Sequence, residues 1–176
     1  MIRPSGAARH CRIMARVGLA ALLLVAGSTT PSAAAGKGRS GLPLPRFVSI
    51  SGAKVNLRTG PGVRYPVAWV FVRANLPVLV TLEFENWRKV RDLDGAEGWI
   101  HQSLLSGRRH GVVTGQVRFL RRKPQPDSPA LLRAEPGVIG RLLACREGWC
   151  RMEIDDVTGW LPQAHLFGAL AGESFD

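Results

Sequence analysis

The chain has 176 residues, with 24 lysines and arginines against 13 acidic residues, so its formal net charge is +11 at pH 7. This length holds one ordinary domain or two very small ones, and it leaves no room for a separate catalytic domain beside them. The positive charge favours anionic partners. The other interpretation, which composition leaves open, is that surplus arginine keeps a small surface soluble.

Residues 1–35 have the order of an export signal. Four arginines precede an apolar run at 17–26, and small residues end the segment at Ala33–Ala35. This order is typical of a secretory signal peptide, here cut after Ala35. The apolar run is shorter than the roughly 20 residues that cross a bilayer, so no stable membrane span is expected. Cleavage lowers the net charge to +7. The protein is therefore predicted to be exported, periplasmic or secreted, and to meet anionic envelope polymers rather than nucleic acid.

After a flexible lead-in at 36–46, short segments rich in valine, leucine and aromatic residues alternate with turn residues, as expected of strands. The expected strands of this first unit are Phe47–Ile50, Lys54–Arg58, Val67–Val72, Val78–Glu83, Trp87–Leu93 and Glu97–His101. Asp94-Gly95 predicts a two-residue hairpin turn with both residues at positive φ. A turn at Glu85-Asn86 places Glu83 opposite Arg88, in an exposed charge pair worth less than about 1 kcal/mol.

The second half of the chain repeats the first. The residues that recur in register are Leu57, Arg58, Pro61, Pro66, Glu85, Trp87, Gly98, Trp99, Gln102 and Leu105, which return as Leu120, Arg121, Pro124, Pro129, Glu147, Trp149, Gly159, Trp160, Gln163 and Leu166. The spacing shrinks by one residue at each of two loops, as duplicated domains do. Two units are therefore predicted, at 47–106 and 116–170, joined by a linker at 107–115 and followed by a tail at 171–176.

Each unit is predicted to be a small β-barrel. No segment after the signal peptide has a helical apolar stripe of useful length, and single 3₁₀ turns are expected at Gln102–Leu105 and Gln163–Leu166. About 60 residues with five or six strands favour a barrel, because a flat sheet leaves unpaired edges. Units of this size bury only about 60% of their unfolded surface, so each is expected to be marginally stable alone.

Cys145 and Cys150 are predicted to form a disulfide. If Glu147-Gly148 makes a two-residue turn, the two cysteines face each other across a hairpin at a distance that a disulfide bridges. Closing so short a loop stabilises by roughly 2 kcal/mol. Zinc is the competing interpretation, but only His165 is a nearby additional ligand, whereas structural zinc sites use four. No metal is expected.

Several motifs together resemble the bacterial SH3-like domain family. They are Val55-Asn-Leu-Arg-Thr-Gly-Pro-Gly62, Tyr65-Pro-Val67, Trp87 and Gly98-Trp-Ile100. The resemblance is strong over 47–106 and weaker over 116–168, where Lys123 replaces the glycine before proline. Both halves resemble the tandem form found as stand-alone exported proteins. This resemblance implies an all-β fold of two small SH3-like barrels in tandem after the signal peptide. It also implies a non-catalytic targeting module, and several such barrels bind peptide portions of peptidoglycan. No cofactor is expected.

A catalytic function is disfavoured by the same residues. Both cysteines of the mature chain are expected to be bridged, so neither is a thiolate nucleophile. His101, His110 and His165 have neither repeat-equivalent places nor the spacing of a triad or metal site. The acidic pair at 155–156 lies at a predicted turn. The chain is predicted not to be an enzyme, and a hydrolase is the third hypothesis.

The candidate ligand-binding residues are aromatics that only the first repeat has. Tyr65, Trp69 and Phe71 are replaced in the second repeat by Ser128, Leu132 and Ala134, whereas the tryptophans shared by both repeats are interpreted as structural. With Arg58 and Arg64 beside them, the first three suit a peptide that carries a carboxylate. The alternative is that they fill the barrel core or a seam between barrels. Exposure of Tyr65 and Trp69 decides between these two interpretations.

A second candidate surface is electrostatic. Six basic residues lie in a stretch without any acidic residue, between Glu97 and Asp127: Arg108, Arg109, Arg118, Arg121, Arg122 and Lys123. They predict a basic groove between the barrels that contacts an anionic envelope polymer, although a solvated linker is the ordinary alternative. The sequence thus predicts an exported binding module for peptidoglycan peptides or an envelope protein segment. The alternative is an envelope assembly protein that uses the basic groove and has no small ligand.

Overall fold

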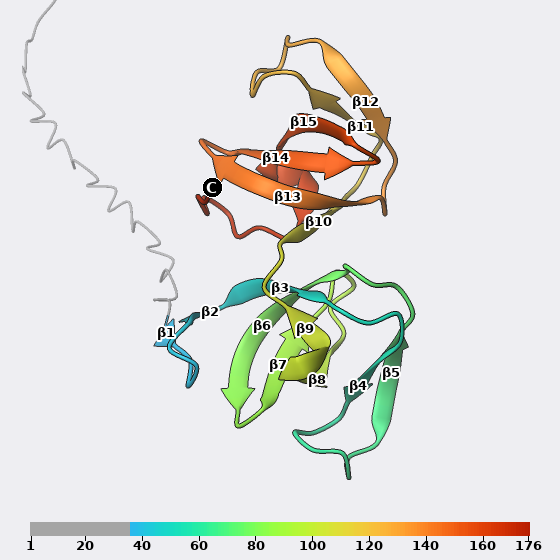
Figure 1. Ribbon diagram of the computed structural model, residues 1–176, viewed down its shortest axis with the longest axis vertical. Coiled ribbons are helices and arrows are strands. Elements are labelled where there is room, and N and C mark those ends of the chain that lie inside the picture. The colour runs from blue at the N-terminus through green and yellow to red at the C-terminus, as the bar shows by residue number, and fades with distance from the viewer. Residues whose placement is uncertain (1–35) are drawn as a thin grey trace, which may run out of the picture. The chain divides into compact units, whose positions relative to one another are not determined.

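Residues 36–176, which the computed structural model describes, fold almost entirely into β-strands (Figure 1). They form two antiparallel sheets of seven strands each and one two-stranded ribbon. The predicted signal peptide lies outside these residues. Within the described part of the chain, no helix has the length and hydropathy that crossing a bilayer requires.

The first sheet contains the six predicted strands and one short closing strand. Its strands are β3 (Arg46–Ile50), β4 (Val55–Arg58), β5 (Val67–Phe71), β6 (Pro77–Phe84), β7 (Trp87–Arg91), β8 (Glu97–His101) and β9 (Leu105–Ser106). They lie in the order β5-β4-β8-β7-β6-β3-β9, and η1 (Gln102–Leu104) is the predicted 3₁₀ turn. The predicted strands are confirmed, with small shifts at their ends.

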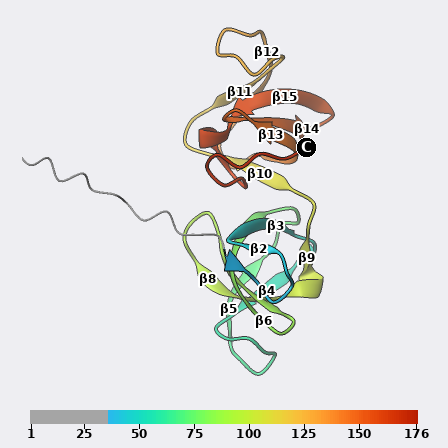
Figure 2. The same ribbon diagram turned by 90° about the vertical axis from the view of Figure 1, so that its left-hand side faces the viewer.

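The second sheet repeats this topology strand for strand (Figure 2). Its strands are β10 (His110–Val113), β11 (Arg118–Arg121), β12 (Ala130–Ala134), β13 (Ile139–Arg146), β14 (Trp149–Ile154), β15 (Val157–Pro162) and β16 (Leu166–Phe167). Their order is β12-β11-β15-β14-β13-β10-β16, and η2 (Gln163–His165) closes the unit. The predicted all-β fold of two SH3-like barrels in tandem is therefore confirmed.

Alternation along the strands builds each core. In β4, Val55 and Leu57 are buried whereas Asn56 and Arg58 between them are partly exposed, because successive strand residues point to opposite faces. The first core gathers Ile50, Val55, Leu57, Phe71, Val78, Val80, Val90 and Ile100. Each such side chain contributes roughly 1.5 to 3 kcal/mol of apolar burial. The core is small, as expected for a barrel of this size.

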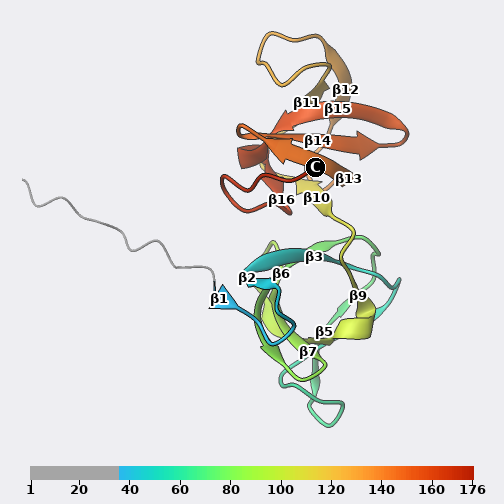
Figure 3. The same cartoon turned by 60° about the vertical axis from the view of Figure 1, so that its left-hand side comes forward.

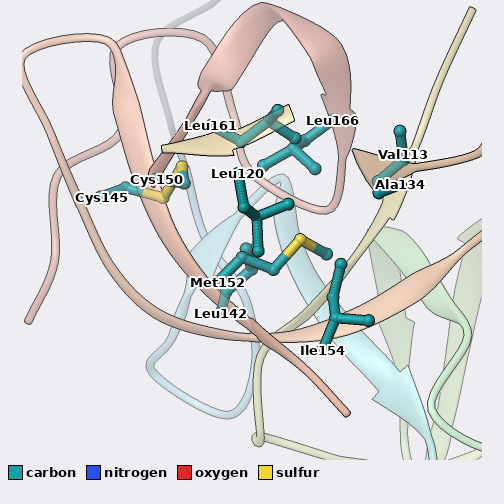
Figure 4. Close-up of a cluster of buried hydrophobic side chains, with 10 residues drawn as sticks. All are labelled: Val113, Leu120, Ala134, Leu142, Cys145, Cys150, Met152, Ile154, Leu161 and Leu166. Atoms are coloured by element: carbon teal, nitrogen blue, oxygen red, sulfur yellow. A yellow bond between two sulfur atoms is a disulfide. The ribbon is translucent and has the colours of Figure 1, made fainter. Parts of the chain in front are cut away.

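The disulfide belongs to the second core. Cys145 and Cys150 are bonded and lie directly opposite each other, with Glu147 and Gly148 both at positive φ in the turn between them. Both cysteines are fully buried. Figure 4 shows their two sulfur atoms joined at the edge of the buried cluster that contains Leu120, Leu142 and Met152. The predicted pairing and turn are confirmed.

The glycine before the last tryptophan of each repeat has a steric cause. A Cβ on Gly98 would lie 2.6 Å from Leu57 Cγ and 2.8 Å from the Arg58 carbonyl oxygen, and one on Gly159 would lie 2.7 Å from Leu120 Cβ. The strand that carries the Gly-Trp motif therefore approaches the strand of the Leu-Arg motif too closely for any side chain. This contact explains why both motifs recur together.

Three segments are more ordered than the sequence indicated. Residues 110–113, inside the predicted linker, form β10 of the second sheet. The lead-in contains β1 (Gly36–Lys37), paired with β2 (Pro43–Leu44). In the tail, Phe175 exchanges two backbone hydrogen bonds with Cys145, at 2.8 and 3.0 Å. These segments are short, so their strand signal is weak. Backbone hydrogen bonds to a neighbouring element order all three, and in β10 the side chains of Val112 and Val113 are also buried.

The turn at Asp94-Gly95 is not the predicted two-residue hairpin. Arg91 pairs with Glu97, so the loop covers residues 92–96, and Gly95 is at positive φ whereas Asp94 is not. The Asp92 carboxylate accepts the backbone N–H groups of Asp94 and Ala96, at 3.0 and 2.8 Å. This local side-chain bond favours a longer turn than the Asp-Gly pair alone predicts.

Glu83 lies opposite Arg88, as predicted, but the charge pair is not exposed. The side chain of Glu83 is 1% exposed, and its carboxylate accepts from Arg46 at 2.7 Å and from both the N–H and hydroxyl of Ser40 at 2.8 Å. Arg88 lies 3.3 Å away. The expected exposure was wrong because the lead-in folds over this carboxylate, which pairwise strand register does not reveal.

Candidate functional site

The predicted ligand residues do not gather in one place. Trp69 is 58% exposed, whereas Phe71 is buried at 6% and belongs to the core. These two line a hollow of about 260 Å³ together with Arg73 and Leu93. Tyr65 is partly buried and lies in the loop at 59–66, away from that hollow. The aromatics of the first repeat thus have separate surroundings, and their role in binding stays a prediction.

Arg58 holds the loop at 59–66 in shape. Its Nη1 donates to the carbonyl oxygens of Val63 and Tyr65, at 3.0 and 2.8 Å. The neighbouring Arg64 is exposed, and its guanidinium lies 5.2 Å from the centre of the Tyr65 ring. Arg58 is therefore already engaged by backbone carbonyls, whereas Arg64 is placed where a bound carboxylate would reach it.

Trp87 lies between two hollows that flank this loop. The smaller hollow, about 180 Å³, is lined by Lys54, Asn56, Arg58, Val63, Trp87, His101 and Leu104. The larger, about 600 Å³, is lined by Pro61, Gly62, Val63, Arg64, Phe84, Glu85, Trp87 and His101. They share Val63, Trp87 and His101, and we refer to the two together as the Trp87 groove.

The aromatic wall of this groove is held by its neighbours. Trp87 in β7 pairs with His101 in β8, and the two rings meet edge to face at 5.4 Å. His101 Nδ1 hydrogen-bonds the Ser103 hydroxyl at 2.8 Å, which fixes the imidazole against the indole. Trp87 is only partly buried, so part of its ring remains available for stacking.

Charges of both signs surround the Trp87 groove. Lys54 and Arg64 supply cations, and Glu85 supplies an anion. A tryptophan flanked in this way suits an extended ligand with an apolar portion, carboxylates and an amine. Backbone carbonyls hold the loop that carries Arg64, so little ordering is required on binding.

The predicted basic groove is not assembled as one surface. Arg109 donates to both oxygens of Glu173, at 2.7 and 2.9 Å, and its guanidinium lies 4.6 Å from the Phe175 ring. Arg121 donates to the Ser128 carbonyl at 2.6 Å. The remaining members are divided between two places, with Arg108 before β10 and Arg118, Arg122 and Lys123 along β11 and the loop that follows it. That loop lies at the end of the second barrel opposite β10 (Figure 3).

His110 lies in a buried, structural environment. His110 Nδ1 lies 2.9 Å from the Ser49 hydroxyl, but that hydroxyl donates to the Arg108 carbonyl and both side chains are buried. Desolvation, more than any charge, lowers the pKa of His110. A serine so buried and so engaged is not placed to attack a substrate. Among residues 36–176, no three His, Cys, Asp or Glu side chains are grouped as a metal site.

The sequence reasoning missed Trp87, Lys54 and His101. Recurrence of Trp87 as Trp149 was interpreted as structural, and Trp160 is indeed buried. Trp87 and Trp149, however, are both only partly buried. Each lies directly after a polar hairpin turn and one strand from the Leu-Arg motif.

A family model described as "Bacterial SH3 domain" matches the chain twice, over residues 51–107 and 115–168. No curated protein matches. Similar solved structures include NlpC2 and NlpC1 from Trichomonas vaginalis and an NlpC/P60 family protein from Bacillus cereus. Their identities are 12%, 11% and 14%, and their TM-scores are 0.33, 0.34 and 0.32. The matches cover 70%, 78% and 69% of this chain and 48%, 50% and 55% of those chains. This chain therefore spans about half the length of these proteins.

Proposed function

The chain belongs to the bacterial SH3 domain family, which is a family of non-catalytic binding modules, and we propose that its Trp87 groove holds short carboxylate-bearing peptides. The peptide portion of peptidoglycan and an extended segment of an envelope protein both have this chemistry. The observation that carries the proposal is the partly exposed Trp87 between two hollows, with cations on either side.

The ligand class follows from the lining. An aromatic face attracts apolar and cationic groups, whereas Lys54 and Arg64 attract carboxylates, and a guanidinium pairs with a carboxylate through two hydrogen bonds. Glu85 complements an amine. Peptides of the cell wall carry free carboxylates and amines together, so they match this pattern better than neutral or purely anionic polymers do.

We further propose that binding takes place outside the cytoplasm. A buried disulfide joins Cys145 and Cys150, and such bonds persist in oxidising compartments. The signal peptide predicted at 1–35 agrees with this location. Purification of the native protein with its amino-terminal sequence determined is the direct test, and a start at Gly36 is the expected result.

Co-sedimentation with purified peptidoglycan sacculi at low salt tests the binding. Residues 36–176 are expected to pellet with the sacculi, and Trp87→Ala is expected to bind at least about tenfold more weakly, because aromatic anchors dominate such interfaces. Trp69→Ala is the matched control and should bind as the wild type does. Recovery of the wild type wholly in the supernatant rules out wall binding.

The second candidate function is assembly with a partner protein, and it rests on the surface around Trp69. Val67, Trp69, Val72 and Leu93 are 43%, 58%, 71% and 46% exposed, and exposed apolar patches mark interaction sites. Capture from an envelope extract separates the two functions. One stoichiometric protein retained by Trp87→Ala but lost with Trp69→Ala favours assembly.

A further inference from the structure

The second barrel has a hollow in the place that corresponds to the smaller part of the Trp87 groove. We refer to it as the Trp149 groove. It measures about 270 Å³ and is lined by Val117, Arg118, Phe119, Arg121, Pro126, Trp149, Leu161, Pro162 and His165. Seven of these residues occupy the repeat-equivalent positions of the seven that line the smaller hollow of the first barrel.

The loops that form one wall of each groove share their hydrogen bonds. Arg121 donates to the Ser128 carbonyl as Arg58 does to the Tyr65 carbonyl. Two backbone hydrogen bonds also recur in each loop. In the first barrel, Thr59 N donates to Pro66 O at 3.0 Å and Tyr65 N to Gly62 O at 3.2 Å. In the second, Arg122 N donates to Pro129 O at 3.0 Å and Ser128 N to Gln125 O at 3.2 Å. Both loops are therefore held in one shape by the barrel itself, which lowers the entropy lost on binding.

The chemistry of the two linings differs. At five of the seven equivalent positions the residue type differs between the two grooves. Lys54 corresponds to Val117, Asn56 to Phe119, Val63 to Pro126, His101 to Pro162 and Leu104 to His165. The Trp149 groove thus gains a second aromatic ring, Phe119, and two prolines, loses the amide and the ammonium of the first groove, and carries its imidazole at His165 instead of at the position of His101. Phe119 is 45% exposed, so this apolar surface is accessible to a ligand.

The charge of the Trp149 groove has one sign. Arg118 and Arg121 line it, and none of the described residues in its lining is acidic. The Nε of Arg118 is buried and has no hydrogen-bond partner among the described residues. Burial, followed by the charge of Arg118, lowers the pKa of His165, so the arginines supply the positive charge. An acceptor from a ligand would complement them.

We propose that the Trp149 groove is a second ligand site, which binds an extended peptide ending in an apolar residue with a free C-terminal carboxylate. The apolar side chain lies against Trp149, Phe119 and the prolines, and the carboxylate pairs with Arg118. A ligand amine is excluded because it would be placed beside the arginine without an acidic partner. Of the two grooves, only the Trp87 groove is lined by an acidic residue, Glu85, that complements a ligand amine. This inference does not depend on what the Trp87 groove binds.

The indole N–H signals in a ¹⁵N–¹H spectrum test the proposal, because the chain has five tryptophans and each gives one signal. The probe is the synthetic peptide acetyl-Ala-Pro-Phe with a free C-terminal carboxylate, added to residues 36–176. The Trp149 signal, assigned with Trp149→Phe, is expected to move, whereas that of Trp69 stays in place. Movement of Trp87 or Trp69 alone, or of no signal, overturns the proposal.

Two variants and one altered probe identify the carboxylate contact. Arg118→Gln is expected to weaken binding about tenfold, and the C-terminal amide of the same peptide should bind as weakly to the wild type. Arg133→Gln changes an exposed arginine of the same barrel that does not line the groove, so it should leave binding unchanged and is the control. Equal binding of the acid and the amide overturns the carboxylate assignment. Failure of this test leaves the sacculus experiment on Trp87 unaffected, so the two proposals fail separately.

Discussion

The two barrels share a strand order but join the same pair of opposed positions by different means. In the first barrel, Glu83 faces Arg88 in a buried ion network, and in the second, Cys145 faces Cys150 in a disulfide. Each pair also contacts a segment that flanks its barrel. Glu83 accepts a hydrogen bond from Ser40 of the lead-in, and the backbone of Cys145 hydrogen-bonds that of Phe175 in the tail. A barrel of this size has little core to spare. One hairpin position thus stabilises each unit and also orders a segment that flanks the barrel.

The largest expected effect is that of Glu83→Gln. The substitution leaves Arg46 and Arg88 without their anion, and their side chains are only 15% and 9% exposed. Removal of one partner from a buried network costs about 3 kcal/mol. Urea unfolding should show this loss, together with faster hydrogen exchange in the lead-in at 36–44. An unchanged urea midpoint would show that the Glu83 network adds no stability to the first barrel, unlike the disulfide in the second.

Removal of the disulfide should have the next largest effect. Cys145→Ala with Cys150→Ala opens a short loop, which costs about 2 kcal/mol on the loop-entropy estimate, and the second barrel should lose this amount. Tail amides near Phe175 should exchange faster with solvent while those of β3 to β9 keep their protection. Equal loss of protection in both barrels would show that the two units do not respond separately.

Acid should weaken the first barrel through Glu83. Desolvation alone would raise the pKa of this carboxyl, but hydrogen bonds from Ser40 and Arg46 and the charge of Arg88 outweigh it and lower the pKa to about 2. A lowered pKa means that the stabilisation is complete above the unfolded value near 4.5 and is lost as pH falls toward 2. The loss is roughly 2 kcal/mol. Melting temperatures measured between pH 6 and pH 2 should show this loss of stability. The melting temperature of Glu83→Gln should depend less steeply on pH.

The smallest effect is expected for an ion pair on the next hairpin of the first barrel, between β7 and β8. Lys89 and Glu97 form an ion pair at 2.8 Å, with side chains 32% and 41% exposed. Solvent screens exposed pairs, so Glu97→Gln should leave the urea midpoint unchanged within error. A shift as large as that of Glu83→Gln would mean that burial does not determine which charge pairs stabilise this barrel.

The sequence was sufficient for the fold because local signals and the repeat agree. Trp87, Gly98 and the Leu-Arg motif place the strands, and Cys145 with Cys150 fix one register. It was not sufficient for the burial of Glu83, because that burial depends on Ser40, more than forty residues away along the chain. The Trp87 groove was missed for a related reason. Whether an indole is partly exposed depends on the loop at 59–66 and on His101, which only the folded chain brings together.

Titration of residues 36–176 with a soluble peptidoglycan peptide, followed through the same five indole N–H signals, tests the central claim most directly. If the Trp87 groove holds the peptide, the Trp87 signal moves first and saturates, and Arg64→Gln weakens the effect. Movement of the Trp69 signal with Trp87 unaffected would contradict the account and would place the ligand on the exposed face of β5.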